Sequence, residues 1–147
     1  VLKSGKTDDR ISFLNNLKEK TPNVKFDLYG IDQVQPIWAD HYFKTIANAK
    51  MGLNLSRGEA IKYYSSDRIT QIVGNGLVCL IDEKTQYRDF FSDSEMIFYK
   101  SLSDLSEKIL KILTIKFIIL VKPFSKILKL HGFHYVNILL RNKKINY

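Results

Sequence analysis

Cysteine is almost absent from this sequence, because Cys79 is the only one among 147 residues. A single thiol excludes a framework of disulfides within the chain, which is how many small secreted domains are stabilised. Cys79 lies in the apolar run LVCLI, where a cysteine usually packs as a small hydrophobic residue. The low cysteine content favours a reducing compartment, and we expect a cytoplasmic protein.

Clusters of metal ligands and long apolar runs are lacking as well. His131 and His134 have no neighbouring cysteine and no acidic residue in the surrounding segment, so we expect no metal site. The longest apolar stretch near the C-terminus, residues 117–121, is far shorter than the roughly 20 residues that a membrane-spanning helix needs. The sequence starts at Val1 without a leader peptide, and we therefore expect an internal fragment of a longer protein.

Acidic residues are missing from the last 40 residues of the chain. Residues 1–107 carry 14 basic and 15 acidic side chains, a net charge of −1, whereas residues 108–147 carry nine basic side chains and no acidic one. The formal net charge of +8 is thus a property of the C-terminal part. The remaining sequence predicts no basic face, so we expect no nucleic-acid partner.

We divide the chain into a domain at residues 1–113 and a basic, isoleucine- and lysine-rich tail at residues 114–147. Three interpretations of the tail stay open: a basic amphipathic segment that contacts the inner face of a membrane, a native but unusual closing element, or the product of a shifted translation frame. AT-rich codons that are translated out of frame yield this composition, and we hypothesise that the chain leaves its true frame near Leu113. Resequencing of the gene tests this hypothesis, which fails if the other frames offer no alternative continuation.

Helical and strand patterns alternate along residues 8–113. Ile11, Leu14 and Leu17 recur at helical spacing, and residues 77–81 form a continuous apolar run of the kind found in strands covered on both faces. Strands that alternate with helices at this spacing indicate an α/β fold with a Rossmann-like parallel sheet and helices on both faces. The predicted helices span residues 8–20, 39–50, 67–73, 84–91 and 102–113, and the predicted strands span residues 24–29, 51–55, 77–81 and 95–101.

Two polar segments stand where an α/β sheet binds its ligands, at the carboxyl ends of strands and the starts of helices. The first is NLSRG at residues 54–58, and the second is YYSSDR at residues 63–68, in which Ser65, Ser66 and Asp67 are suited to cap a helix. A helix start flanked by cations favours a diphosphate, because the helix dipole and the cations both attract negative charge. The candidate ligands are Ser56, Arg57, Lys62, Ser66 and Arg68.

A purely structural interpretation of these residues stays open beside the functional one. Asp67 and Arg68 are also suited to be a helix cap and a solvated helix charge, and Arg57 is suited to a solvated loop. Tyr63 and Tyr64 are residue types that pack more often than they form ligand platforms. Spacing alone does not separate the two interpretations.

The order of these segments resembles the C-terminal half of a GT-B glycosyltransferase, and within that fold it is most similar to the spore-maturation glycosyltransferase-like group. The resemblance covers residues 24–113 and combines an arginine at a helix start, a polar residue three positions later, a glycine turn, a buried strand and a later acidic-aromatic strand. The segments that carry it are KFDLYG, MGLNLSRG, YYSSDRITQIVGNGLVCLID and DFFSDSEMIFYKSLSDLSEKI.

This resemblance implies a donor site for a nucleoside-diphosphate sugar, without an obligatory metal or other cofactor. It implies that Arg68 faces the diphosphate leaving group and acts in catalysis, with Ser56, Arg57, Lys62 and Ser66 as further ligands. Gln71 stands where many relatives carry a glutamate that binds the ribose hydroxyls. The amide accepts one hydrogen bond and donates another, so we expect weakened rather than abolished nucleotide binding.

The resemblance also implies that a separate N-terminal domain brings a glycan or lipid-linked acceptor. The leading hypothesis is therefore the donor-binding domain of a glycosyltransferase that acts in polysaccharide biosynthesis and that binds its donor without completing transfer by itself. A non-catalytic α/β binding or regulatory module is the alternative, favoured by the glutamine at position 71. A third hypothesis, a protein of nucleic-acid or membrane surfaces, depends on the tail alone.

Overall fold

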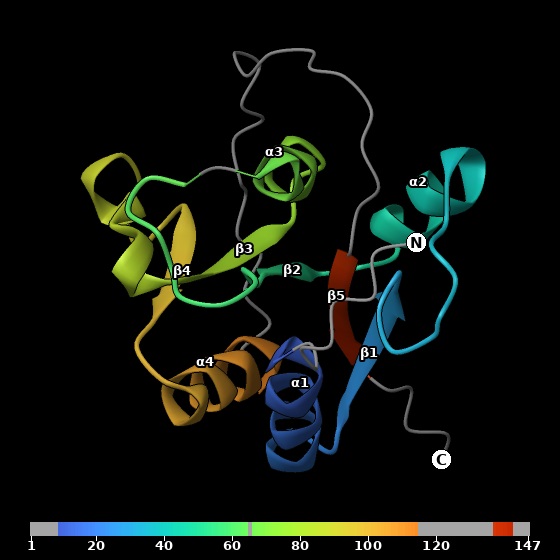
Figure 1. Cartoon of the computed structure of the whole chain (residues 1–147), viewed down its shortest axis with the longest axis horizontal. Coiled ribbons are helices and arrows are strands. Elements are labelled where there is room, and N and C mark those ends of the chain that lie inside the picture. Colours follow the sequence, from blue (N-terminus) through green and yellow to red (C-terminus); the bar gives the residue numbers. More distant parts are fainter. Residues whose placement is uncertain (1–8, 65, 115–136, 143–147) are drawn as a thin grey trace.

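The computed structural model describes residues 9–64, 66–114 and 137–142, which form a five-stranded sheet with helices around it (Figure 1). The strand order is β1-β5-β2-β3-β4. The strands are β1 (Val24–Tyr29), β2 (Met51–Asn54), β3 (Val78–Asp82), β4 (Met96–Tyr99) and β5 (Asn137–Asn142). The helices are α1 (Asp9–Lys20), α2 (Ala39–Ala47), α3 (Asp67–Gly74) and α4 (Leu102–Thr114), with the short 3-10 helices η1 (Glu83–Thr85) and η2 (Tyr87–Asp89).

Strands β2, β3 and β4 are parallel neighbours, as the sequence predicts. Strand β5 is antiparallel to both β1 and β2, so β1 points in the same direction as the three parallel strands. The fold class is thus α/β, with a Rossmann-like sheet whose body strands share one direction. Their carboxyl ends meet at one edge of the sheet, where the polar segments of the sequence lie.

Each face of the sheet has its own hydrophobic core, because successive side chains of a strand point to opposite faces. In β3, Val78 and Leu80 belong to the core that α1 and α4 cover, whereas Cys79 and Ile81 belong to the core that α2 and α3 cover. Figure 1 shows α1 and α4 on one side of the sheet and α3 on the other. Cys79 is fully buried, as predicted for a small hydrophobic residue, and burial raises the pKa of its thiol to about 12.

Helix α3 packs directly on β2, and a glycine makes this close approach possible. A Cβ atom at Gly52 would lie 2.5 Å from Cγ1 of Ile72, a fully buried side chain of α3. No larger residue has room there unless Ile72 shifts. Gly52 therefore allows α3 to pack closely on β2.

The sequence predicts four of the helices and the four strands of the body correctly to within a few residues, but the predicted helix at residues 84–91 is wrong. The chain there forms η1 and η2, because Gln86 between them has a left-handed φ of 56° and ends the helical hydrogen bonding. The sequence also predicts no strand at the position of β5, which falls in the proposed tail. His131 and His134 lie outside the described residues, and the division at residue 113 stays a prediction.

Among the residues that the structure describes, no helix is long and apolar enough to cross a membrane. A search of the same residues finds no group of three histidine, cysteine, aspartate or glutamate side chains that could hold a metal ion.

Candidate functional site at the carboxyl edge of the sheet

The N-terminus of α3 lies against the carboxyl end of β2, the arrangement expected from the sequence. Ser66 occupies the N-cap position in an extended conformation, but its hydroxyl makes no capping hydrogen bond. It donates instead to Oδ1 of Asn54, the last residue of β2, over 3.1 Å. The predicted side-chain cap by Ser66 is therefore wrong, because the buried Asn54 amide competes for the same hydroxyl. Ser65 lies outside the described residues.

Arg68, in the first turn of α3, extends to the same strand end. Its NH1 atom donates to the backbone carbonyl of Leu55 over 2.9 Å and to Oδ1 of Asn54 over 3.3 Å. Ser66 and Arg68 thus share one acceptor at the carboxyl end of β2. A planar guanidinium held in this way is a fixed donor, and fixed donors suit the oxygens of a phosphate.

A second arginine, which sequence reasoning missed, lies near Arg68. Arg10 in the first turn of α1 is buried, with 4% of its surface exposed. Burial lowers the pKa of the Arg68 guanidinium, and the positive charge of Arg10 lowers it further. Arginine still stays protonated at neutral pH, since its ordinary pKa is above about 12. The edge of the sheet therefore concentrates two positive charges.

The sequence contains a signal that would have found Arg10. Arg10 precedes Leu14 by four positions and Leu17 by seven, so all three lie on one face of α1. That face is the buried one in the structure. A buried arginine needs compensating partners, which makes its position on an apolar helix face a notable signal.

The other predicted ligands lie on the loop between β2 and α3 and on α3 itself. Ser56 is half-buried directly after Leu55, and Arg57 beside it is exposed. Lys62 lies with Nζ 4.7 Å from the centre of the Tyr63 ring. Gln71 is half-buried one turn after Arg68 on α3. The structure therefore brings Ser66 and Arg68 together by direct contacts to one strand end, whereas Lys62 interacts with an aromatic ring.

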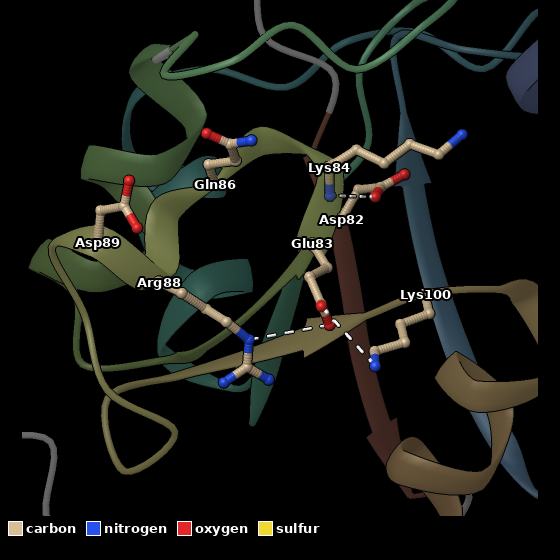
Figure 2. A pocket seen from close by; sticks show the side chains of 7 residues that line it. All are labelled: Asp82, Glu83, Lys84, Gln86, Arg88, Asp89 and Lys100. Atoms are coloured by element: carbon tan, nitrogen blue, oxygen red, sulfur yellow. Dashed lines mark hydrogen bonds and ion pairs between the residues drawn. The ribbon is translucent and has the colours of Figure 1, made fainter.

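A hollow of about 450 Å³ opens next to this site, where β3 and β4 end (Figure 2). Glu83 lies near its centre, with Oε2 3.8 Å from Nε of Arg88 and Oε1 3.8 Å from Nζ of Lys100. Sequence reasoning missed these residues, although Glu83 and Lys100 directly follow the ends of β3 and β4 and so obey the same rule of carboxyl ends. The hollow is lined by Asp82, Glu83, Lys84, Gln86, Arg88, Asp89 and Lys100.

Comparison with known proteins identifies a family. Residues 10–115, most of the chain and all elements from Arg10 to the end of α4, match the model of a family described as Glycosyl transferase-like. No curated protein and no solved structure matches the chain significantly.

Proposed function

Because this chain belongs to the glycosyl transferase-like family, we propose that it is the donor-binding domain of a glycosyltransferase. It binds a nucleoside-diphosphate sugar as donor substrate and uses no resident cofactor. The sugar passes to a glycan, polysaccharide or lipid-linked acceptor that another domain presents on the cytoplasmic side of a membrane. Within the family we favour the spore-maturation glycosyltransferase-like group, on the motifs of residues 24–113.

The observation that carries this proposal is the position of Arg68. A guanidinium at the N-terminus of α3, fixed by Leu55 and Asn54, faces the edge where a sheet of this class binds its ligands. The N-terminal backbone N–H groups of the helix add to the attraction for an anion. The nearby charge of Arg10 strengthens the same field. A diphosphate is the ligand that these features favour.

The mechanistic role of this site is to stabilise the leaving group. When the bond between the sugar and the nucleotide breaks, negative charge grows on the terminal phosphate oxygens. Donors that are already in position lower the energy of that state without a cost for reorganisation. In this proposal Arg68 is the catalytic residue, Ser56, Ser66, Arg57 and Lys62 are further diphosphate ligands, and Gln71 binds the ribose.

Titration calorimetry of the full chain with UDP, GDP, ADP and CMP tests the proposal. We expect one nucleotide to bind selectively and Arg68→Ala to weaken that binding by about 10- to 100-fold, because hydrogen bonds to charged groups contribute about 1.5–3 kcal/mol. Arg68→Lys keeps the charge but loses the planar fork of donors, so its nucleotide affinity should lie between those of the wild type and Arg68→Ala. Glu59→Gln, a change at an exposed carboxylate of the same loop, serves as a control that should bind normally.

Circular dichroism must accompany this titration, since Arg68 also joins α3 to β2. A folded chain that binds none of the four nucleotides would overturn the proposal. That outcome would favour a non-catalytic α/β binding or regulatory module, for which the glutamine at position 71 is the supporting feature.

A further inference from the structure

Two exposed aromatic rings form a contact pair beside the hollow. Tyr63 lies in the loop before α3 and Phe90 directly follows η2, and 42% and 63% of their surfaces are exposed. Their ring centres are 5.1 Å apart with an angle of 63° between the ring planes. The two rings therefore form a small exposed aromatic surface next to polar side chains.

Several contacts hold the Tyr63 ring in position. Its backbone N–H donates to the carbonyl of Thr85 over 2.9 Å, and its hydroxyl donates to Oδ2 of Asp89. Tyr63 has a left-handed φ of 55°, which is an unfavourable conformation for a large side chain. Strain of this kind persists where the surroundings enforce it, and it concentrates at binding sites.

The hollow adds polar groups to this pair. Asp89, the partner of the Tyr63 hydroxyl, also lines the hollow, and so does Gln86 (Figure 2). The backbone of Gln86 is left-handed, like that of Tyr63. A volume of about 450 Å³ lies within the usual range of small-molecule sites, roughly 300–1,000 Å³. All residues that line it are polar or charged, and the two aromatic rings lie beside it.

We propose that the exposed Phe90 ring, held by the Tyr63 ring packed against it, is the stacking platform of a sugar-binding subsite, in which Asp89 and Gln86 bind the hydroxyl groups. A pyranose ring has one face of C–H groups that packs on an aromatic ring, and hydroxyl groups around its edge that need polar partners. The subsite depends on the proposed function for the source of its sugar, either the donor or the acceptor.

Saturation-transfer NMR with the full chain tests the subsite. The probes are the methyl glycosides of glucose, galactose, mannose and N-acetylglucosamine, and UDP-glucose and GDP-mannose beside free UDP and GDP. We expect saturation of the pyranose C–H protons of at least one probe, reduced about fivefold or more by Tyr63→Ala and by Phe90→Ala. Phe43→Ala, at an equally exposed ring on α2, should leave the signal unchanged.

The two kinds of probe distinguish the sources of the sugar. Saturation of free glycosides indicates the acceptor, and saturation of the pyranose only when it is joined to a nucleotide indicates the donor. The subsite is overturned if no pyranose ring is saturated, or if Tyr63→Ala and Phe90→Ala leave the signal intact. Nucleotide binding that Arg68→Ala weakens, together with a failed pyranose signal, would retain the donor proposal and reject the subsite. Glycoside binding that Tyr63→Ala weakens, without any nucleotide binding, would retain the subsite and reject the donor proposal.

Discussion

Asp104 is a residue that stabilises the start of helix α4 next to the hollow. Its carboxylate accepts hydrogen bonds from the backbone N–H of Lys100 over 2.9 Å and from Nζ of Lys108 over 2.8 Å. Its own N–H bonds to the Ser101 hydroxyl just before α4. The two backbone bonds resemble a capping box, except that the carboxylate accepts from the N–H of Lys100 and not from that of Ser101, and they fix the start of α4 next to Lys100, which lines the hollow.

We predict that Asp104→Asn lowers the free energy of unfolding by about 0.5–1 kcal/mol at pH 7. The hydrogen bond from Lys108, followed by that from Lys100, lowers the pKa of Asp104 in the folded state. The stabilisation is therefore complete above the unfolded pKa of about 3.9 and is lost as the pH falls through the lower folded pKa. Urea denaturation of both proteins between pH 7 and pH 2.5 should show the difference shrink towards the acid end.

Asp93→Asn is the matched control for this experiment. Its carboxylate pairs with Arg88, but both side chains are exposed, and such pairs contribute little. A difference between wild type and Asp104→Asn that stays constant over the whole pH range would contradict the capping role of the charge.

At the scale of elements, the distance between α3 and β2 decides where Arg68 lies. The helix is short, and its buried residues Ile69, Ile72 and Val73 hold it on the sheet. Because Ile72 occupies the space above Gly52, the helix cannot move outward without losing this packing. The close packing that Gly52 allows thus holds the helix that carries Arg68, whose guanidinium is fixed by its own bonds to Asn54 and Leu55.

We predict that Gly52→Ala lowers the free energy of unfolding by about 1–3 kcal/mol, the usual effect of overpacking a core. Ile72→Ala in the same chain removes the atoms that the new Cβ would meet. The loss of unfolding free energy in the double variant should therefore be smaller than the sum of the losses in the two single variants. Gly74→Ala is the control: a Cβ there meets nothing within 4 Å, and alanine favours a helix. Additive effects of Gly52→Ala and Ile72→Ala would contradict a direct clash.

The sequence predicts elements of this fold where local periodicity is decisive. The apolar run that becomes β3 and the stripe of Leu14 and Leu17 on α1 are visible without a structure. The 3-10 helices η1 and η2 are not predicted, because Gln86 adopts a left-handed backbone conformation. A glycine at this position would have indicated that conformation in the sequence, whereas a glutamine does not. The hollow beyond β3 was missed for another reason: Glu83 and Lys100 are 17 positions apart and meet only after β3 and β4 have paired.

The sequence predicts only part of the candidate site, because order along the chain is local whereas contacts between elements are not. The cations and hydroxyls of the segment that ends in α3 were predicted from their order along the chain. Their partners at the end of β2 depend on tertiary structure, and so does the choice of Ser66 to bond Asn54 rather than the helix backbone. The roles of these residues toward a donor stay predictions until nucleotide binding is measured.

For the whole molecule, the sheet is continuous only because of β5. Strands β1 and β2 both pair with β5, which lies between them, and β1 contacts the rest of the sheet across it. Removal of β5 would leave two strand edges without backbone partners in the middle of the sheet.

We predict that a chain ending at residue 114 loses hydrogen-exchange protection at the amides of β1 and at those amides of β2 that face β5, while the remaining amides of β2, β3 and β4 keep theirs. The reason is that β3 and β4 pair with each other and β3 pairs with β2 independently of β5. Exchange measured by mass spectrometry on both chains gives the comparison, and far-UV circular dichroism confirms that the shorter chain retains its helices. Unchanged protection of β1 would show that β5 contributes nothing to the sheet in solution.

The pairing of Val24 with Asn142 also sets the order in which the molecule is completed. Contacts between residues so distant along the chain form late, because a very long loop must close before they contribute. During synthesis the helices and the three parallel strands leave the ribosome first, and the gap beside β2 stays open until residue 142 has emerged. The place between β1 and β2 is therefore filled after both of its neighbours, and for that interval the nascent chain presents two open strand edges to chaperones and to other chains.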